Sequence, residues 1–223
     1  DVTFAAGAPY QVLLDGRVVK TPGKRPLAAP NAKLASAIAD EWSAQVGHID
    51  PASMPLTRYA NTAIDAVADH QGAVAVDIAA YAASDLLCYR AEAPMELVVA
   101  QAARWDPVVA WAREALDAPF VVASGVMPVE QPPEAIAAIA AALLPHDAMR
   151  LTALHILTTL TGSALLAIAH ARGRLTADEV WAAAHIDEDY QIALWGQDSE
   201  AAQRRKGRRI EFDAASRMLA LLQ

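Results

Sequence analysis

Hydrophobic and polar positions follow two different periods along this chain, and the period changes early. Residues 10–14 and 17–20 alternate as short strands and flank Asp15-Gly16, a dipeptide typical of two-residue hairpin turns. A third short strand is predicted at 25–27. Beyond this segment apolar residues recur every three or four positions, which predicts helices. We therefore expect an α+β fold, mostly α, with a small N-terminal β-hairpin module followed by a larger multi-helical domain.

The helical part begins with a recognisable cap. Asn31 can cap a helix whose apolar stripe carries Leu34, Ile38 and Trp42. Two domains are expected, at 1–50 for the β-containing module with its first helix and at 51–223 for the helical domain. A break is expected where Asp106 could cap a new helix at Pro107, a short strand-like run follows at 120–122, and later helices are predicted at 133–144, 147–171, 177–195 and roughly 199–221.

One uncharged stretch, from Leu151 to Ala171, is long enough to raise the question of a membrane span. It contains two histidines, four threonines, Gly162 and Ser163, which makes it too polar for a single span. The stretch is interpreted as a buried core helix in which Ser163 lies mid-helix, and no stable membrane insertion is expected.

Composition removes several functional classes. The net charge of −8 argues against a general nucleic-acid binder, and only 10 glycines leave little room for a phosphate-binding loop. The single cysteine, Cys88, excludes an intrachain disulfide. His146 and His155 are nine residues apart, which does not give the one-face spacing of a helical metal site. We expect no enzyme activity, no cofactor, no metal and no small-molecule substrate.

A basic run from Arg204 to Arg209 supports an alternative function, that of a helical nucleic-acid or ribonucleoprotein accessory protein. Glu200 precedes Arg204 by four residues, and Glu211 follows Arg208 by three. These spacings favour ion pairs along one solvated helix face. Nucleic acid is therefore not expected as a partner.

The acidic residue Glu188 stands out in the helix predicted at 177–195. Thr176 and Glu179 form a capping box that starts this helix. Glu188 falls on a largely apolar stripe made of Trp181, Ala184, Glu188, Ile192 and Trp195. A carboxylate is costly to bury unless an opposite charge or a hydrogen bond compensates it. Either an internal arginine pairs with Glu188, or the residue recognises another protein.

Several segments, taken in order, resemble the assembly chaperones of the ATP synthase catalytic sector, specifically those that hold the alpha subunit. The resemblance spans nearly the whole chain. It implies an ATP-independent chaperone that binds the unassembled alpha subunit and prevents its aggregation until beta binds. The similar segments are Leu14-Asp15-Gly16-Arg17, Lys20-Thr21-Pro22, Glu41-Trp42, Met54-Pro55-Leu56-Thr57, Asn61-Thr62, Ser84-Asp85-Leu86-Leu87-Cys88-Tyr89-Arg90, Trp105-Asp106-Pro107, Asp187-Glu188-Asp189-Tyr190-Gln191 and Trp195-Gly196.

The resemblance also implies where the client binds. An acidic residue in the late helix matters in the family, and Glu188 matches it best, with Asp187 one position away. The partner-binding residues expected on this basis are Asp187, Glu188, Gln191, Trp195 and Asp198. The free chaperone is expected to be a monomer, in the bacterial cytoplasm or in the mitochondrial matrix of a eukaryote.

Overall fold

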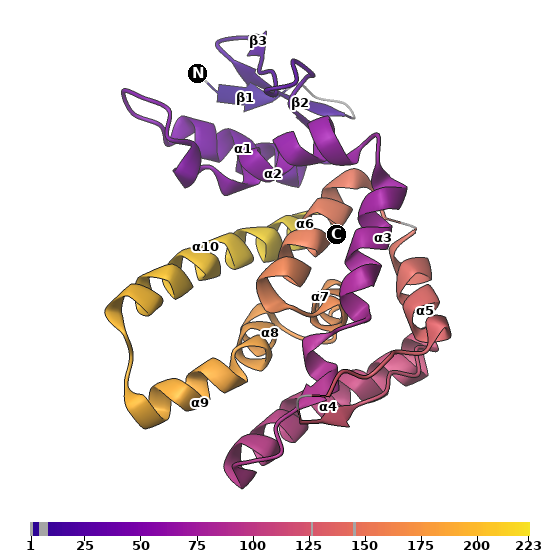
Figure 1. Ribbon diagram of the computed structural model, residues 1–223. Coiled ribbons are helices and arrows are strands. Elements are labelled where there is room, and N and C mark those ends of the chain that lie inside the picture. Colours follow the sequence, from indigo (N-terminus) through magenta and orange to yellow (C-terminus); the bar gives the residue numbers. More distant parts are fainter. Residues whose placement is uncertain (1, 5–8, 126, 145) are drawn as a thin grey trace. The chain divides into compact units, whose positions relative to one another are not determined.

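A computed structural model describes residues 2–4, 9–125, 127–144 and 146–223. Helices dominate it and a small antiparallel sheet lies at the N-terminal end, which confirms the α+β, mostly α fold class (Figure 1). The chain divides into two compact units, the first made of residues 1–71, 146–153 and 213–223, and the second of residues 72–145 and 154–212. The division into domains at residue 50 stays a prediction.

The sheet of the first unit is built around β2 (Tyr10–Leu14). The hairpin is confirmed, because Asp15 and Gly16 both have positive φ values, 49° and 74°, as its turn requires. The strand expected at 25–27 is wrong: the structure has one isolated bridge, between Lys20 and Pro26. The sheet is antiparallel, with β1 (Val2–Phe4) on one side of β2 and with β3 (Arg17–Val18) and β4 (Ala28–Ala29) on the other.

The sheet covers two helices, α1 (Ala32–Ser43) and α2 (Pro55–Thr62), as Figure 1 shows. The predicted cap is confirmed, since the Asn31 side chain accepts a hydrogen bond from the Leu34 N–H at 2.9 Å. A short 3₁₀ turn (Pro51–Ser53) precedes α2, and a π-helical turn (Ala63–Val67) follows it.

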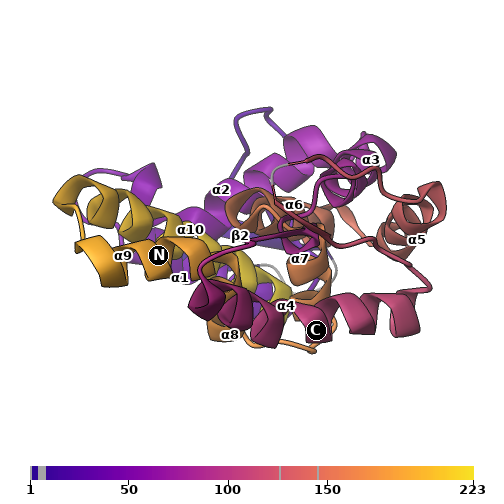
Figure 2. The same cartoon turned by 60° about the horizontal axis from the view of Figure 1, so that its bottom comes forward.

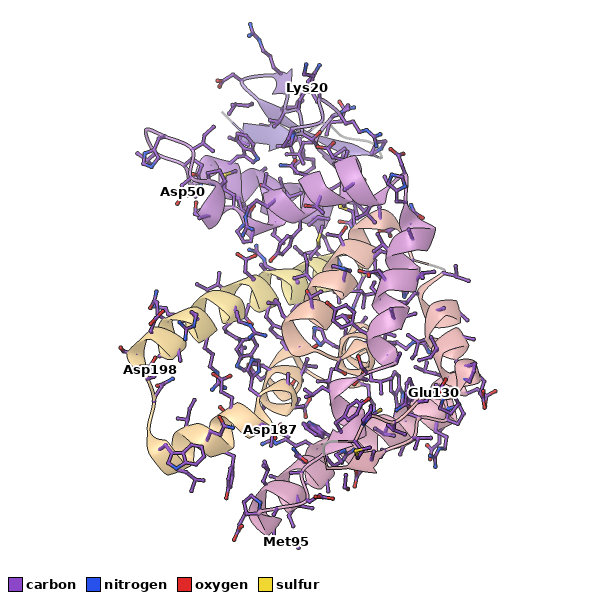
Figure 3. The ribbon with its side chains drawn as sticks, viewed as in Figure 1. Lys20, Asp50, Met95, Glu130, Asp187 and Asp198 are labelled. Atoms are coloured by element: carbon purple, nitrogen blue, oxygen red, sulfur yellow. The ribbon has the colours of Figure 1, made fainter. Side chains whose placement is uncertain are left out.

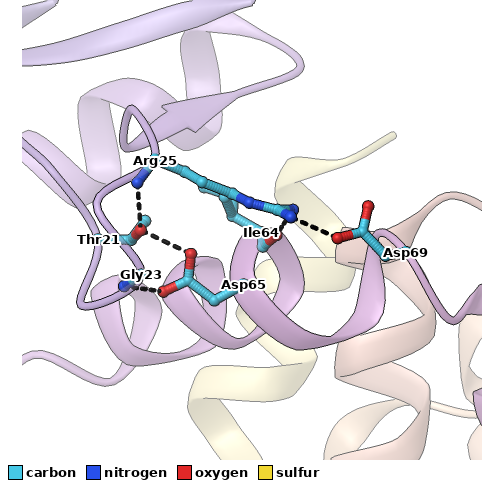
Figure 4. A network of polar contacts seen from close by, with 6 residues as sticks. All are labelled: Thr21, Gly23, Arg25, Ile64, Asp65 and Asp69. Carbon is cyan, nitrogen blue, oxygen red and sulfur yellow. Dashed lines mark hydrogen bonds and ion pairs between the residues drawn. The ribbon is translucent and has the colours of Figure 1, made fainter.

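A polar network fastens the turn after β3 to the end of this helical segment (Figure 4). Asp65 accepts hydrogen bonds from the Thr21 hydroxyl at 2.6 Å and from the Gly23 N–H at 2.7 Å. Arg25 donates to the Ile64 carbonyl and pairs with Asp69. The turn therefore has a fixed geometry because one carboxylate holds two of its donors.

The second unit contains most of the remaining helices. Two of the longer helices, α6 and α10, contribute residues to both units. The elements after the π-helical turn are α3 (Gln71–Ala82), a 3₁₀ turn (Leu86–Cys88), β5 (Tyr89–Arg90), α4 (Met95–Leu116), β6 (Ala123–Ser124), α5 (Pro133–Leu143), α6 (Ala148–Thr161), α7 (Ala164–Ala171), α8 (Ala177–Ala184), α9 (Ile186–Trp195) and α10 (Ser199–Leu221). The strand-like run at 120–122 is displaced, because β6 starts at Ala123 and pairs in parallel with β5.

The break expected at Pro107 is wrong, because α4 continues through it. A proline inside a helix removes one N–H donor but does not prevent packing from holding the helix together. Asp106 does not cap a helix; its carboxylate pairs with Arg90 at 2.7 Å. The Arg90 guanidinium also lies over the buried Trp105 ring, 5.1 Å from its centroid. These contacts hold the turn of α4 that directly precedes the proline.

The single helix predicted at 147–171 is two helices, α6 and α7. Gly162 has a φ of 70°, which ends α6, and Ser163 caps α7 by accepting a hydrogen bond from the Leu166 N–H at 3.0 Å. Ser163 is therefore an N-cap and not a mid-helix residue. The α7 residues from Ala164 to Ala169 are buried, as expected for a core helix. Within the described part of the chain, every helix is too short or too polar to cross a bilayer.

Candidate functional site

The helix that carries the candidate site is interrupted at His185. The capping box of Thr176 and Glu179 is confirmed, but α8 ends at Ala184 and α9 begins at Ile186. His185 has non-helical torsion angles (φ −119°, ψ 20°) and its ring stacks on Trp181, with 3.9 Å between centroids. One continuous stripe from Trp181 to Trp195 is therefore wrong.

The two tryptophans have opposite environments. Trp181 is buried and packs against Phe212 at 5.3 Å between ring centroids. Trp195 is 78% exposed, and its neighbour Leu194 is 56% exposed. The premise that Glu188 lies on a core-facing stripe is thus incorrect, since the end of α9 presents apolar area to solvent.

Glu188 has an internal arginine within reach, but not as a close partner. Its Oε2 lies 3.9 Å from the Nε of Arg205, and its side chain is 40% exposed. Arg205 makes its short contact with Asp189, at 2.5 Å between Nη2 and Oδ1. Asp189, which is not among the candidate residues, is the main ion-pair partner of Arg205. The Glu188 carboxylate therefore retains acceptor capacity on its exposed side.

Asp187 has a structural task. Its Oδ1 accepts a hydrogen bond at 2.7 Å from Nε2 of Gln101, a buried residue of α4. The same amide accepts a bond from the Ala91 N–H at 2.8 Å. Asp187 therefore anchors the first turn of α9 to α4, in addition to placing negative charge at a helix N-terminus, where it is favourable.

Four of the five candidate residues line one groove between α9 and the start of α10; Asp187 does not line it. This α9–α10 groove has a volume of about 300 Å³. Figures 1 and 2 both show α9 turning back into α10 through the link after Gly196. Figure 3 shows Asp187 at the start of α9 and Asp198 beyond its far end. The lining consists of Glu188, Gln191, Ile192, Trp195, Gly196, Gln197, Asp198, Ala201 and Ala202.

The link that shapes the groove depends on two residues. Gly196 has φ 81° and ψ 173°, a conformation that is essentially restricted to glycine. Asp198 then caps α10, because its Oδ1 accepts a hydrogen bond from the Ala201 N–H at 2.8 Å. Asp198 is therefore a helix cap as well as part of the groove wall.

Glu188 also borders a smaller hollow of about 220 Å³ on its other side, lined by His185, Arg204, Arg205 and Arg208. Burial, followed by the charges of Arg205 and Arg208, lowers the pKa of the His185 imidazole below its ordinary value. His185 is therefore held towards its neutral form, which avoids adding a further cation beside the arginines.

The arginines of the basic run have partners within the chain. The predicted pair of Arg204 with Glu200 is present at 2.6 Å. Arg208 donates to the Leu160 carbonyl at 2.5 Å, and Arg209 pairs with Asp178 at the same distance. Together with the Arg205–Asp189 pair, these contacts attach the run to α6, α8 and α9. This is a structural use of the charges that the nucleic-acid alternative assigns to phosphates.

The Cys88 thiol and the His155 imidazole lie in different surroundings. Burial raises the pKa of the Cys88 thiol to about 12, which leaves it protonated at neutral pH. His155 pairs with Asp77 at 2.7 Å. Across residues 2–4, 9–125, 127–144 and 146–223, there is no group of three or more histidine, cysteine or acidic side chains that could hold a metal ion.

Sequence reasoning missed the partner of the acidic cluster. Arg205 reaches Asp189 from a different helix, 16 positions along the chain, and no periodic pattern connects the two residues. It also missed Leu194, which is exposed beside Trp195 at the end of α9. The spacing of apolar residues along the chain does not indicate this exposure.

Comparison with known proteins gives a consistent result. Residues 1–113 match the family described as ATP12 chaperone protein. The fold is similar to the crystal structure of the Atu1473 protein from Agrobacterium tumefaciens, with 47% identity, a TM-score of 0.95, and coverage of 100% of this chain and 84% of that one. It is also similar to Atp12 from Paracoccus denitrificans, with 43% identity, a TM-score of 0.94, and coverage of 100% and 96%. The chain therefore belongs to the ATP12 chaperone protein family.

Proposed function

We propose that this chain is an ATP-independent assembly chaperone that binds the unassembled alpha subunit of the ATP synthase catalytic sector. It covers an interface that alpha later gives to beta, and so prevents aggregation. Membership of the ATP12 chaperone protein family supports this proposal. The place of action is the bacterial cytoplasm, or the mitochondrial matrix in a eukaryote, and the free chaperone is a monomer.

The observation that carries the proposal is the α9–α10 groove with Trp195 exposed at its end. A tryptophan that is 78% exposed leaves a large apolar area in water. Tryptophan is among the residues that most often dominate the energy of protein interfaces. The exposed indole and the neighbouring Leu194 therefore provide area that a client surface can cover.

The charges of the groove favour a cationic or donor-rich feature of the client. Glu188 and Asp198 both line it, and Ile192 adds an apolar side chain to the lining. A client arginine could lie over the Trp195 ring and place its guanidinium within reach of the Glu188 carboxylate. Such an ion pair would add direction to an otherwise apolar contact.

Co-expression with the alpha subunit tests the function directly. The chain is expressed with alpha alone, and with alpha and beta together, and soluble alpha and co-purified alpha are measured. Alpha should be soluble and bound in the first case and released in the second. Insoluble alpha without any co-purification would remove the proposal.

Two variants test the groove. Trp195→Ala should weaken alpha binding by at least about tenfold, since an anchor residue contributes about 2 kcal/mol or more. Glu188→Ala should lower alpha recovery while the chaperone keeps its thermal stability. Glu114→Ala, an exposed acidic residue on α4, is the matched control and should bind normally.

A folding failure of Glu188→Ala would contradict the recognition role. It would mean that the 3.9 Å contact with Arg205 is needed for the fold. Equal alpha binding by Glu188→Ala and the wild type would place client recognition elsewhere.

A further inference from the structure

The first unit carries a second hollow surface, which we call the β3 groove. It is lined by Leu14, Val18 and Val19 of the hairpin, by Trp42 of α1, and by Ile49 of the loop that follows α1. Its two adjoining parts have volumes of about 540 and 430 Å³ and share Leu14 and Trp42. Ile49 is 55% exposed and Val18 is 37% exposed. The surface is therefore hollow, apolar and open to solvent.

The wall formed by β3 is an open sheet edge. In the sheet order of the described residues, β3 has β2 as a neighbour on one side and no strand on the other. Val18 faces Leu13, and Val19 donates to the Val12 carbonyl at 2.9 Å one position later. Because hydrogen-bonded and non-hydrogen-bonded pairs alternate in an antiparallel ladder, Val18 occupies a non-hydrogen-bonded position. Its N–H and C=O therefore point away from β2, towards the open side.

We propose that the β3 groove binds an extended apolar segment of the client chain, which adds to the β3 edge as a further strand. An extended backbone offers both a donor and an acceptor to Val18, and its alternate side chains enter the apolar hollow. A second copy of this chain is a poorer occupant. In a two-fold contact the same surface faces itself, and two hollows do not fill one another.

This inference rests on the proposed function, because the client is the same. It differs in the place of contact: the α9–α10 groove lies in the second unit, whereas the β3 groove lies wholly within the first. A variant confined to the first unit therefore separates the two proposals.

The test compares Val18→Lys with Val76→Lys in co-purification of the alpha subunit. A lysine on an edge strand is a common obstacle to strand addition, because an added strand would have to place its own residues beside the charge. Val76 is an exposed valine of α3 and supplies a matched control. Val18→Lys should bind alpha about tenfold more weakly, whereas Val76→Lys and the conservative Val18→Thr should bind as the wild type does. Thermal unfolding of each variant checks that the fold is intact.

Amide hydrogen exchange of the wild type, measured with and without alpha, gives an independent result. Strand addition should slow exchange of the Val18 N–H in the complex. Alpha bound equally by Val18→Lys and the wild type, with unchanged exchange at Val18, would overturn the inference and leave the proposed function intact. Loss of a concentration-dependent dimer in Val18→Lys would also overturn it, because the occupant would then be a second copy. Failure of the wild type to hold alpha would overturn both proposals.

Discussion

Asp85 is a fully buried carboxylate that joins two helix starts, and its replacement should have a pH-dependent cost. Its Oδ1 accepts from the Leu87 N–H, and its Oδ2 accepts from the Leu165 N–H, both at 3.1 Å. The first donor lies in the 3₁₀ turn at 86–88, and the second lies in the first turn of α7. Ser163 and Ala164 also donate to this carboxyl group.

In Asp85→Asn one oxygen becomes an NH₂ group that faces a backbone N–H. One buried donor then loses its acceptor, which should lower the free energy of unfolding by about 1–3 kcal/mol at pH 7. Urea unfolding followed by circular dichroism measures this difference.

The difference should widen as the pH falls. Burial raises the pKa of Asp85 from 3.8 to about 6, and this effect exceeds the opposing effect of its hydrogen bonds. The folded protein therefore takes up a proton before the unfolded chain does, so the wild type is stabilised as the pH falls from 7 to 5, by about 1 kcal/mol. Asp85→Asn lacks this group and should not gain the increment.

Urea unfolding of both proteins at pH 7 and pH 5 gives the comparison. Since all other titrating groups are shared, the difference between the two proteins isolates Asp85. A difference that stays constant or narrows towards pH 5 would show that burial does not raise the pKa of Asp85. It would mean that the backbone and hydroxyl donors stabilise the ionised carboxylate more than burial destabilises it.

Three further substitutions should lower the free energy of unfolding. Glu41→Gln should cost about 1–2 kcal/mol in urea unfolding, since Glu41 accepts from the Leu56 and Thr57 N–H groups at 2.8 and 2.7 Å. Gly196→Ala should cost about 1–3 kcal/mol in the same assay, because alanine is strained at φ 81° and ψ 173°. A Cβ there would meet no atom within 4 Å, so a steric clash adds nothing to this cost. Trp105→Phe removes a donor to a buried carbonyl, with a bond of 2.8 Å, and should lower the melting temperature by several degrees, about 1 kcal/mol or more. Unchanged stability in any of the three would mean that the hydrogen bond or strain in question carries no net energy.

Local sequence signals are reliable where one short segment contains both interacting residues. The Asp15-Gly16 turn, the Asn31 cap and the capping box at Thr176 are each made by residues at most three positions apart, and all three are confirmed. The fold class followed from the same periods.

Predictions failed where distant contacts decide the outcome. Pro107 stays inside α4 because Arg90 holds Asp106, and Gly162 ends α6 although the apolar pattern continues across it. In the candidate site, spacing placed Glu188 and Trp195 on one face but could not show which face is covered. The exposure of Trp195 depends on where α9 ends relative to the rest of its unit.

The composition of the first unit has a consequence for synthesis. Its sheet and first helices emerge early, but the unit also includes residues 213–223. Asn31 donates to the Leu221 carbonyl at 2.8 Å, and Arg150 donates to the Leu222 carbonyl at 2.9 Å. Met218 and Leu219 are buried. The first unit therefore cannot complete its packing on the ribosome until residues 213–223 have been made. A truncation after residue 212 would damage the part of the protein that is synthesised first.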